Sequence, residues 1–159
     1  WRYNFLKTIK FNVFAIFLAF GCVYTAQARG NAPMRLAGTE WILLEISSPD
    51  SVITLDRAKL RADGMGDVFT LKFEADRVSG KGAPNRYTAS CQWRGKILRI
   101  GQAASTKMLA FREPEQLKEA QFFDYLSRVE SWDLLPDNNL VLMLKDSGGA
   151  AVSLVFGKL

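Results

Sequence analysis

Histidine is absent from the 159-residue chain, and cysteine occurs only twice, as Cys22 and Cys91. Without histidine, the chain cannot build a Ser-His-Asp or Cys-His catalytic centre, an imidazole metal site or a histidine pH switch. Cys22 lies in the apolar segment near the N-terminus, so a domain without that segment would keep Cys91 alone. One cysteine can neither close an internal disulfide nor form a thiolate metal site. We therefore predict no cofactor and no metal.

Acidic residues are missing before Glu40, and this absence accounts for much of the formal net charge of +5. Without residues 1–28, 18 of the 21 basic residues remain against all 16 acidic ones, a net charge of +2. No basic run alternates with aromatic residues. A nearly neutral surface of this kind argues against nucleic acid as a partner.

The first 28 residues have the pattern of a secretory signal peptide. Three basic residues precede an apolar stretch at residues 11–20, and Ala26-Gln27-Ala28 predicts cleavage before Arg29. The apolar stretch is shorter than the roughly 20 residues of a transmembrane helix. This reading predicts an exported protein.

A lipoprotein signal that ends at Cys22 is an alternative, because Gly21 is small, although Phe20 is bulky where such signals prefer a small residue. A lipid on Cys22 would tether the domain to a membrane. An uncleaved anchor is the third alternative. All three readings place the domain outside the cytoplasm.

The remaining chain, with 48% apolar and 23% charged residues overall, is typical of one globular domain. We expect a lead-in at residues 29–35 and the domain at 36–157. Alternating or dense apolar runs predict short strands at 41–46, 52–55, 67–74, 77–79, 86–93, 98–100, 132–135, 140–144 and 152–156. The predicted fold is α+β: a compact antiparallel meander, partly barrel-like, with one main helix packed on it.

That helix is expected to begin at Glu113-Pro114-Glu115, because proline and acidic residues suit a first helical turn. Its apolar stripe, with Phe122 beside it, runs through Leu117, Ala120, Phe123, Leu126 and Val129. Residues 56–65 are interpreted as an exposed, charged loop, with a helical turn as an alternative. The stripe is most simply explained as core packing.

Residues 79–108 contain a glycine-rich loop, two strands and a loop that carries Thr106. Cys91 falls on the same face as Tyr87 and Trp93, which predicts a buried, inert thiol rather than a reactive one. Lys81, Asn85 and Arg86 are the candidate contact patch on the loop. The alternative for Asn85 is that it caps a turn or satisfies buried backbone groups.

Several segments resemble the META domain, the family of the bacterial heat-shock lipoprotein HslJ. They occur in the family's order and are L-A-G-T-E-W at 36–41, Phe73, R-V-S-G at 77–80, N-R-Y at 85–87, L-R-I at 98–100 and A-S-T-K-M at 104–108. The family often carries cysteines just before the Asn and just after the Met, where this chain has Pro84 and Ala110. A redox or disulfide role therefore does not carry over.

The resemblance implies a periplasmic or outer-membrane-associated protein with a link to stress or antibiotic tolerance, and it defines no catalytic residues. Our first hypothesis is a non-enzymatic envelope protein that binds a partner, either a protein or a lipid. The second is a lipid or small-ligand binder, similar to secretin pilots, with a cavity at Phe69, Phe73, Trp93 and Phe123. The third is an enzyme that uses Asp56 and Asp63 as acid and base.

Overall fold

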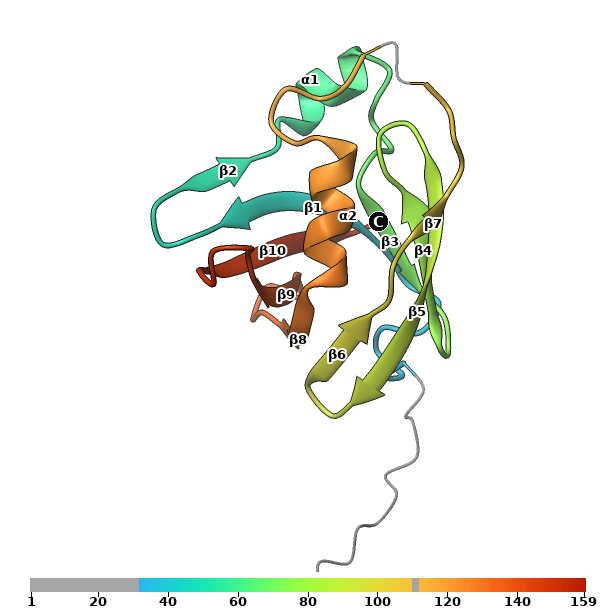
Figure 1. Cartoon of the computed structure of the whole chain (residues 1–159), viewed down its shortest axis with the longest axis vertical. Helices are drawn as coiled ribbons and strands as arrows, with labels where there is room; N and C mark the ends of the chain where they lie inside the picture. The colour runs from blue at the N-terminus through green and yellow to red at the C-terminus, as the bar shows by residue number, and fades with distance from the viewer. Residues whose placement is uncertain (1–31, 110–111) are drawn as a thin grey trace, which may run out of the picture.

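The computed structural model describes residues 32–109 and 112–159 (Figure 1). The predicted signal peptide, Cys22 and Ala110 lie outside these residues, as does the lead-in before Ala32. Within the described residues, no helix is long and apolar enough to cross a membrane. The first described residue is already attached to the domain, because the Ala32 backbone N–H donates to the Ala75 carbonyl at 2.9 Å.

Strands make up most of the described chain, and all pairings between named strands are antiparallel. The strands are β1 (Glu40–Ser47), β2 (Val52–Thr54), β3 (Thr70–Phe73), β4 (Arg77–Lys81), β5 (Arg86–Arg94), β6 (Ile97–Ile100), β7 (Ala104–Ser105), β8 (Val129–Leu134), β9 (Leu140–Lys145) and β10 (Ala151–Lys158). The two helices are α1 (Arg57–Ala62) and α2 (Glu119–Ser127).

The sheet closes on itself because the last strand pairs with the first. Its order is β10-β9-β8-β6-β5-β4-β3-β1, and β1 then pairs with β10 over a register that runs from Trp41–Lys158 to Ser47–Ser153. Eight strands thus form a barrel, while β2 and β7 pair with β1 and β5 beside it. The predicted antiparallel, barrel-like meander is confirmed, and the expectation of one main helix needs correction.

The barrel interior is filled by side chains that alternate along the strands. In β5, Tyr87, Ala89, Cys91 and Trp93 are buried and the residues between them are exposed, as the alternation predicts. The Trp93 ring lies 5.1 Å from Phe73 and 5.9 Å from Trp132, both edge-on. These rings pack on one another in the arrangement that aromatic pairs prefer.

The main helix is shorter than its apolar pattern predicts. Residues 113–118 are not helical, and α2 begins only at Glu119. Pro114 and Leu117 are buried in this extended segment, so tertiary packing replaces the expected first turns. Within α2, Phe122 and Leu126 are buried, whereas Ala120 is exposed.

Figure 1 shows α2 lying across the strands, and its buried Phe122 anchors it to the barrel. Its ring lies 5.1 Å from Phe69 and 6.0 Å from Tyr87. Phe69 precedes β3 and has a φ of 59°, so it does not belong to the alternating strand predicted there. A phenylalanine in the left-handed region is uncommon and is held in place by its surroundings. Here the Leu43 N–H donates to its carbonyl at 3.0 Å.

The charged segment at 56–65 contains a short helix, α1 (Arg57–Ala62), as the alternative of a helical turn in this loop allowed. The Asp56 carboxylate accepts from the Lys59 N–H at 2.9 Å and caps α1. Arg57 donates to the Leu43 carbonyl through Nε at 2.8 Å and to the Val68 carbonyl at 3.0 Å. Burial lowers the pKa of Arg57 to about 10, which leaves it charged at neutral pH. The guanidinium therefore ties α1 to β1 and to the segment before β3.

Burial also governs the chemistry of Cys91. The side chain is 4% exposed, and desolvation raises the pKa of the thiol to about 12. Since the thiolate is the reacting species, iodoacetamide should modify Cys91 only slowly in the folded protein at pH 8 and rapidly in urea. Peptide mass spectrometry reads Cys91 separately from Cys22. Equal rates with and without urea would contradict the burial of this thiol.

Candidate functional site

Asn85 and Glu119 form a hydrogen-bonded centre between the β4–β5 loop and the start of α2. One oxygen of Glu119, Oε1, accepts from the backbone N–H groups of Ala83 and Asn85, both at 2.7 Å. The other, Oε2, accepts from Asn85 Nδ2 at 2.7 Å. A single carboxylate therefore satisfies three donors of the loop and fixes the loop against the helix.

The other side of Asn85 holds the segment after β7. Asn85 Oδ1 accepts from the Met108 N–H at 2.7 Å and from Thr106 Oγ1 at 2.8 Å. The Arg86 N–H donates in turn to Thr106 Oγ1 at 3.2 Å, and the Arg86 carbonyl accepts from the Thr106 N–H at 3.0 Å. We call Asn85, Thr106, Met108 and Glu119 the polar hub. It joins two of the segments on which the family resemblance rests.

The loop approaches α2 so closely that position 82 has no room for a side chain. A Cβ on Gly82 would lie 2.5 Å from Glu119 Oε1 and 2.9 Å from the Phe123 ring. Glycine at this position therefore permits the short bonds of the polar hub.

Asn85 was predicted as part of a contact patch, and its place in the polar hub corrects that prediction. Asn85 is only 6% exposed and its amide is fully engaged, so it is not a surface group. The alternative reading of Asn85, that it satisfies buried backbone groups, agrees with this geometry. Arg86 is exposed and Lys81 is half-buried, and their role as a contact patch stays a prediction.

Lys81 and Arg86 line a groove of about 420 Å³ over β3 and β4. Lys81 Nζ contacts Asp67 Oδ1 at 2.7 Å, and this hydrogen bond holds the pKa of Asp67 below its usual value. Lys72 Nζ contacts Glu40 Oε1 at 2.9 Å. Leu71 and Tyr87 add apolar lining, and Tyr87 Oη donates to the Thr70 carbonyl at 2.8 Å.

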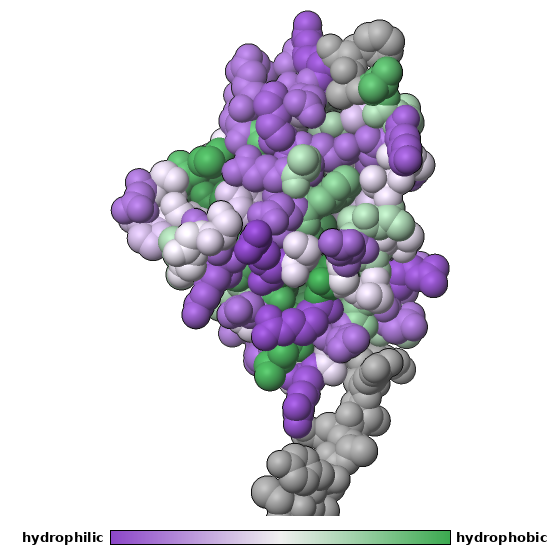
Figure 2. Space-filling model, in the orientation of Figure 1, coloured by the Kyte–Doolittle hydropathy of each residue, from purple (hydrophilic) through white to green (hydrophobic). Residues whose placement is uncertain are grey.

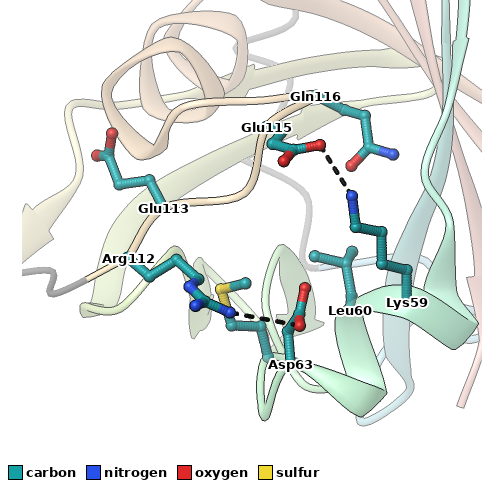
Figure 3. Close-up of a pocket in the computed structure, with 8 residues that line it drawn as sticks. Lys59, Leu60, Asp63, Arg112, Glu113, Glu115 and Gln116 are labelled. Atoms are coloured by element: carbon teal, nitrogen blue, oxygen red, sulfur yellow. Dashed lines mark hydrogen bonds and ion pairs between the residues drawn. The ribbon is translucent and has the colours of Figure 1, made fainter.

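A second depression, of about 360 Å³, lies between α1 and the segment before α2 (Figure 3). Two ion pairs cross it: Lys59 Nζ to Glu115 Oε2 at 2.9 Å and Arg112 to Asp63 Oδ1 at 3.4 Å. The side chains of Lys59, Glu115 and Arg112 are 53%, 80% and 71% exposed and that of Asp63 is 31% exposed, so solvent screens both pairs and neither adds much to stability. Leu60 lies beneath them.

A small depression of about 90 Å³ connects these two. Its lining shares Lys81 with the groove over β3 and β4, and it shares Met65 and Arg112 with the depression beside α1. Its own walls include Val68, Ala83 and Pro84. We call the three together the end groove; Figure 2 shows hydrophilic surface over α1, beside which the groove begins.

The residues of the enzyme hypothesis have structural roles at this end of the molecule. Asp56 caps α1, and Asp63 pairs with Arg112. Among the described residues, no group of three or more Cys, Asp or Glu side chains could hold a metal ion. The aromatic residues assigned to a lipid cavity, such as Phe69, Phe73 and Trp93, contact other rings instead.

Sequence reasoning missed Glu119, the acceptor at the centre of the polar hub. No local pattern marks it, because its partners Ala83 and Asn85 lie 36 and 34 residues earlier. The one local signal in the sequence, an acidic side chain in the first turn of a helix, pointed to Glu113 and Glu115 instead, since the helix was expected to start there.

Comparisons with known proteins agree with this architecture. The NMR structure of a protein from Burkholderia xenovorans is similar, with a TM-score of 0.57 and 19% sequence identity over 77% of this chain and 83% of that one. At this identity the likeness shows the fold alone. No protein with a curated description matches the chain. A family model of the META domain matches residues 34–156, and the chain therefore belongs to the META domain family.

Proposed function

We propose that this protein is exported to the cell envelope, periplasmic or associated with the outer membrane, and acts there by binding a partner rather than by catalysis. Membership of the META domain family and the signal-like pattern of residues 1–28 support this role. The observation that carries it is the end groove, where exposed Arg86 begins β5 directly after the loop that the polar hub fixes. By resemblance to the family, the role is linked to stress or antibiotic tolerance.

A lipid or small hydrophobic ligand inside the barrel is the weaker alternative. The ligand would need the space between sheet and helix, where Phe122 contacts Phe69 and Tyr87. Binding there would require displacing rings that are nearly fully buried. The end groove is open to a partner without such a rearrangement.

A photo-crosslinking amino acid placed at Arg86 in intact cells should yield discrete crosslinked products, because a bound partner would lie within reach of the groove. The matched control position is Lys145, which is also exposed but lies at the end of β9, outside the residues that line the groove. Equal products from both positions, or none from position 86, would contradict partner binding at the groove.

The same cells test the export part of the proposal. Fractionation should place the protein in the envelope, and mass spectrometry should find either a new N-terminus at Arg29 or a lipid on Cys22. Retention of the intact chain in the cytoplasm would overturn export. An envelope protein with no crosslinks would keep export and overturn the binding role.

A further inference from the structure

We propose that the end groove binds an extended, acidic polypeptide segment of the partner, with a carboxylate of that segment paired to Arg86. The inference rests on the proposed partner-binding function and adds the chemistry of the partner. Three features of the groove support it: an exposed arginine for which no ion pair is seen among the described residues, an ordered backbone at that arginine, and a small apolar depression next to it.

The charge argument concerns the cations that line the end groove. Every one except Arg86 already has a carboxylate: Lys59 has Glu115, Lys72 has Glu40, Lys81 has Asp67 and Arg112 has Asp63. Among the described residues, the Arg86 guanidinium has no hydrogen bond or ion pair; it acts on Asp67 only through the weaker electrostatic attraction of a charge at longer range, because Lys81 holds that carboxylate. An incoming carboxylate can therefore pair with Arg86 without breaking an existing ion pair. A guanidinium also binds a carboxylate through two parallel hydrogen bonds.

The backbone of Arg86 is already ordered by hydrogen bonds, and this order favours binding. Its N–H and carbonyl are both bonded to Thr106, and its strand pairs with β4 through Lys81. The partner thus has only the side chain of Arg86 to immobilise. Binding to a pre-ordered group loses less conformational entropy than binding to a mobile loop.

The shape of the groove fits an extended segment. The connecting depression, with Val68, Ala83 and Pro84 in its walls, has room for one small aliphatic side chain. It shares Lys81 with the part of the groove that contains Arg86. In an extended chain, every second side chain points the same way. One segment can therefore direct an aliphatic and an acidic side chain into the groove together.

The test uses three blocked pentapeptides that differ only at the centre. Each has valine at both ends and serine at the second and fourth positions, with glutamate, glutamine or lysine between them, so that the valines and the central residue share a face. The protein, purified as the cell processes it and labelled with ¹⁵N, is titrated and followed by NMR. We expect the amide signals of residues 81–86 and 65–68 to shift, and the glutamate peptide to bind about threefold tighter than the glutamine peptide.

Matched variants separate the role of Arg86 from general charge. Arg86→Gln should remove the preference for glutamate, whereas Arg77→Gln, an exposed arginine at the other end of the same hairpin, should leave it unchanged. Equal binding of the glutamate and lysine peptides, or no saturable shift up to about 10 mM peptide, would overturn the proposal.

A lipid surface is the competing source of negative charge. If phosphatidylglycerol vesicles shift the same amides while the peptides do not, the acidic-segment proposal is wrong. Crosslinks from position 86 together with failed peptide binding would also overturn it, yet would leave the partner-binding function standing. Absence of crosslinks from that position would remove the function on which this inference rests.

Discussion

Replacing Phe122 by alanine is expected to lower the free energy of unfolding by about 3–5 kcal/mol. The ring is fully buried and lies against Phe69 and Tyr87, so its loss would leave a cavity between α2 and the barrel. With nine residues, α2 is too short to be stable alone and depends on this packing. Urea unfolding followed by tryptophan fluorescence measures the change.

Phe123→Ala is the matched comparison, because both residues are phenylalanines at adjacent positions of the same helix. The Phe123 ring is half-buried and lies 5.2 Å from Tyr87. Since less apolar surface is lost, we expect a clearly smaller destabilisation than for Phe122→Ala. An equal or larger effect at Phe123 would favour the stripe read from the sequence over the packing seen in the structure.

Replacing Asn85 by alanine is expected to cost about 2–4 kcal/mol. The substitution removes the acceptor of the Met108 N–H and of Thr106 Oγ1, and the donor to Glu119 Oε2. The two segments that the polar hub joins would then keep only the bonds between Arg86 and Thr106 and the β5–β7 pairing. Gln92→Ala, at an exposed position of the strand that follows Asn85, should change stability by less than about 0.5 kcal/mol and serves as the control.

Asn85→Asp sharpens this test, because aspartate has nearly the same shape as asparagine. It would place a second carboxylate where the amide now donates to Glu119 Oε2 at 2.7 Å. Two carboxylates so close repel, and protonation of either relieves the repulsion. The variant should therefore be least stable near neutral pH and recover relative to wild type in acid. A constant difference across pH would show that the Asn85–Glu119 contact is not important for stability.

The polar hub also explains how this chain holds together a region where its family often has cysteines. Pro84 stands at the first of those positions, directly before Asn85; the second, Ala110, lies outside the described residues. Glu119 and Asn85 connect the two segments by hydrogen bonds alone. Thr106, which donates to Asn85, also bonds the backbone of Arg86, so the stability tests at Asn85 and the binding tests at Arg86 concern one hydrogen-bonded region.

Local patterns were sufficient for most of the strands. The alternation at residues 86–93 predicted β5 and the burial of Cys91, because each residue's face in a strand follows from its position alone. The absence of histidine excluded whole classes of site without any structure. Motifs spread from residue 36 to residue 108 were enough to indicate the family.

The tertiary structure decided the features that join distant parts of the chain. Pairing of Trp41 with Lys158 closes the barrel, and no local pattern encodes that contact. Burial of Pro114 and Leu117 delays the helix to Glu119, because packing outweighs a weak helical preference. In the sequence, Asn85 is an ordinary polar loop residue. Only the fold brings it to Glu119, 34 positions later, which accepts hydrogen bonds from its backbone and its side chain. Which side chains are buried, and which hydrogen-bond partners they find, depends on which distant segments come into contact in the folded chain.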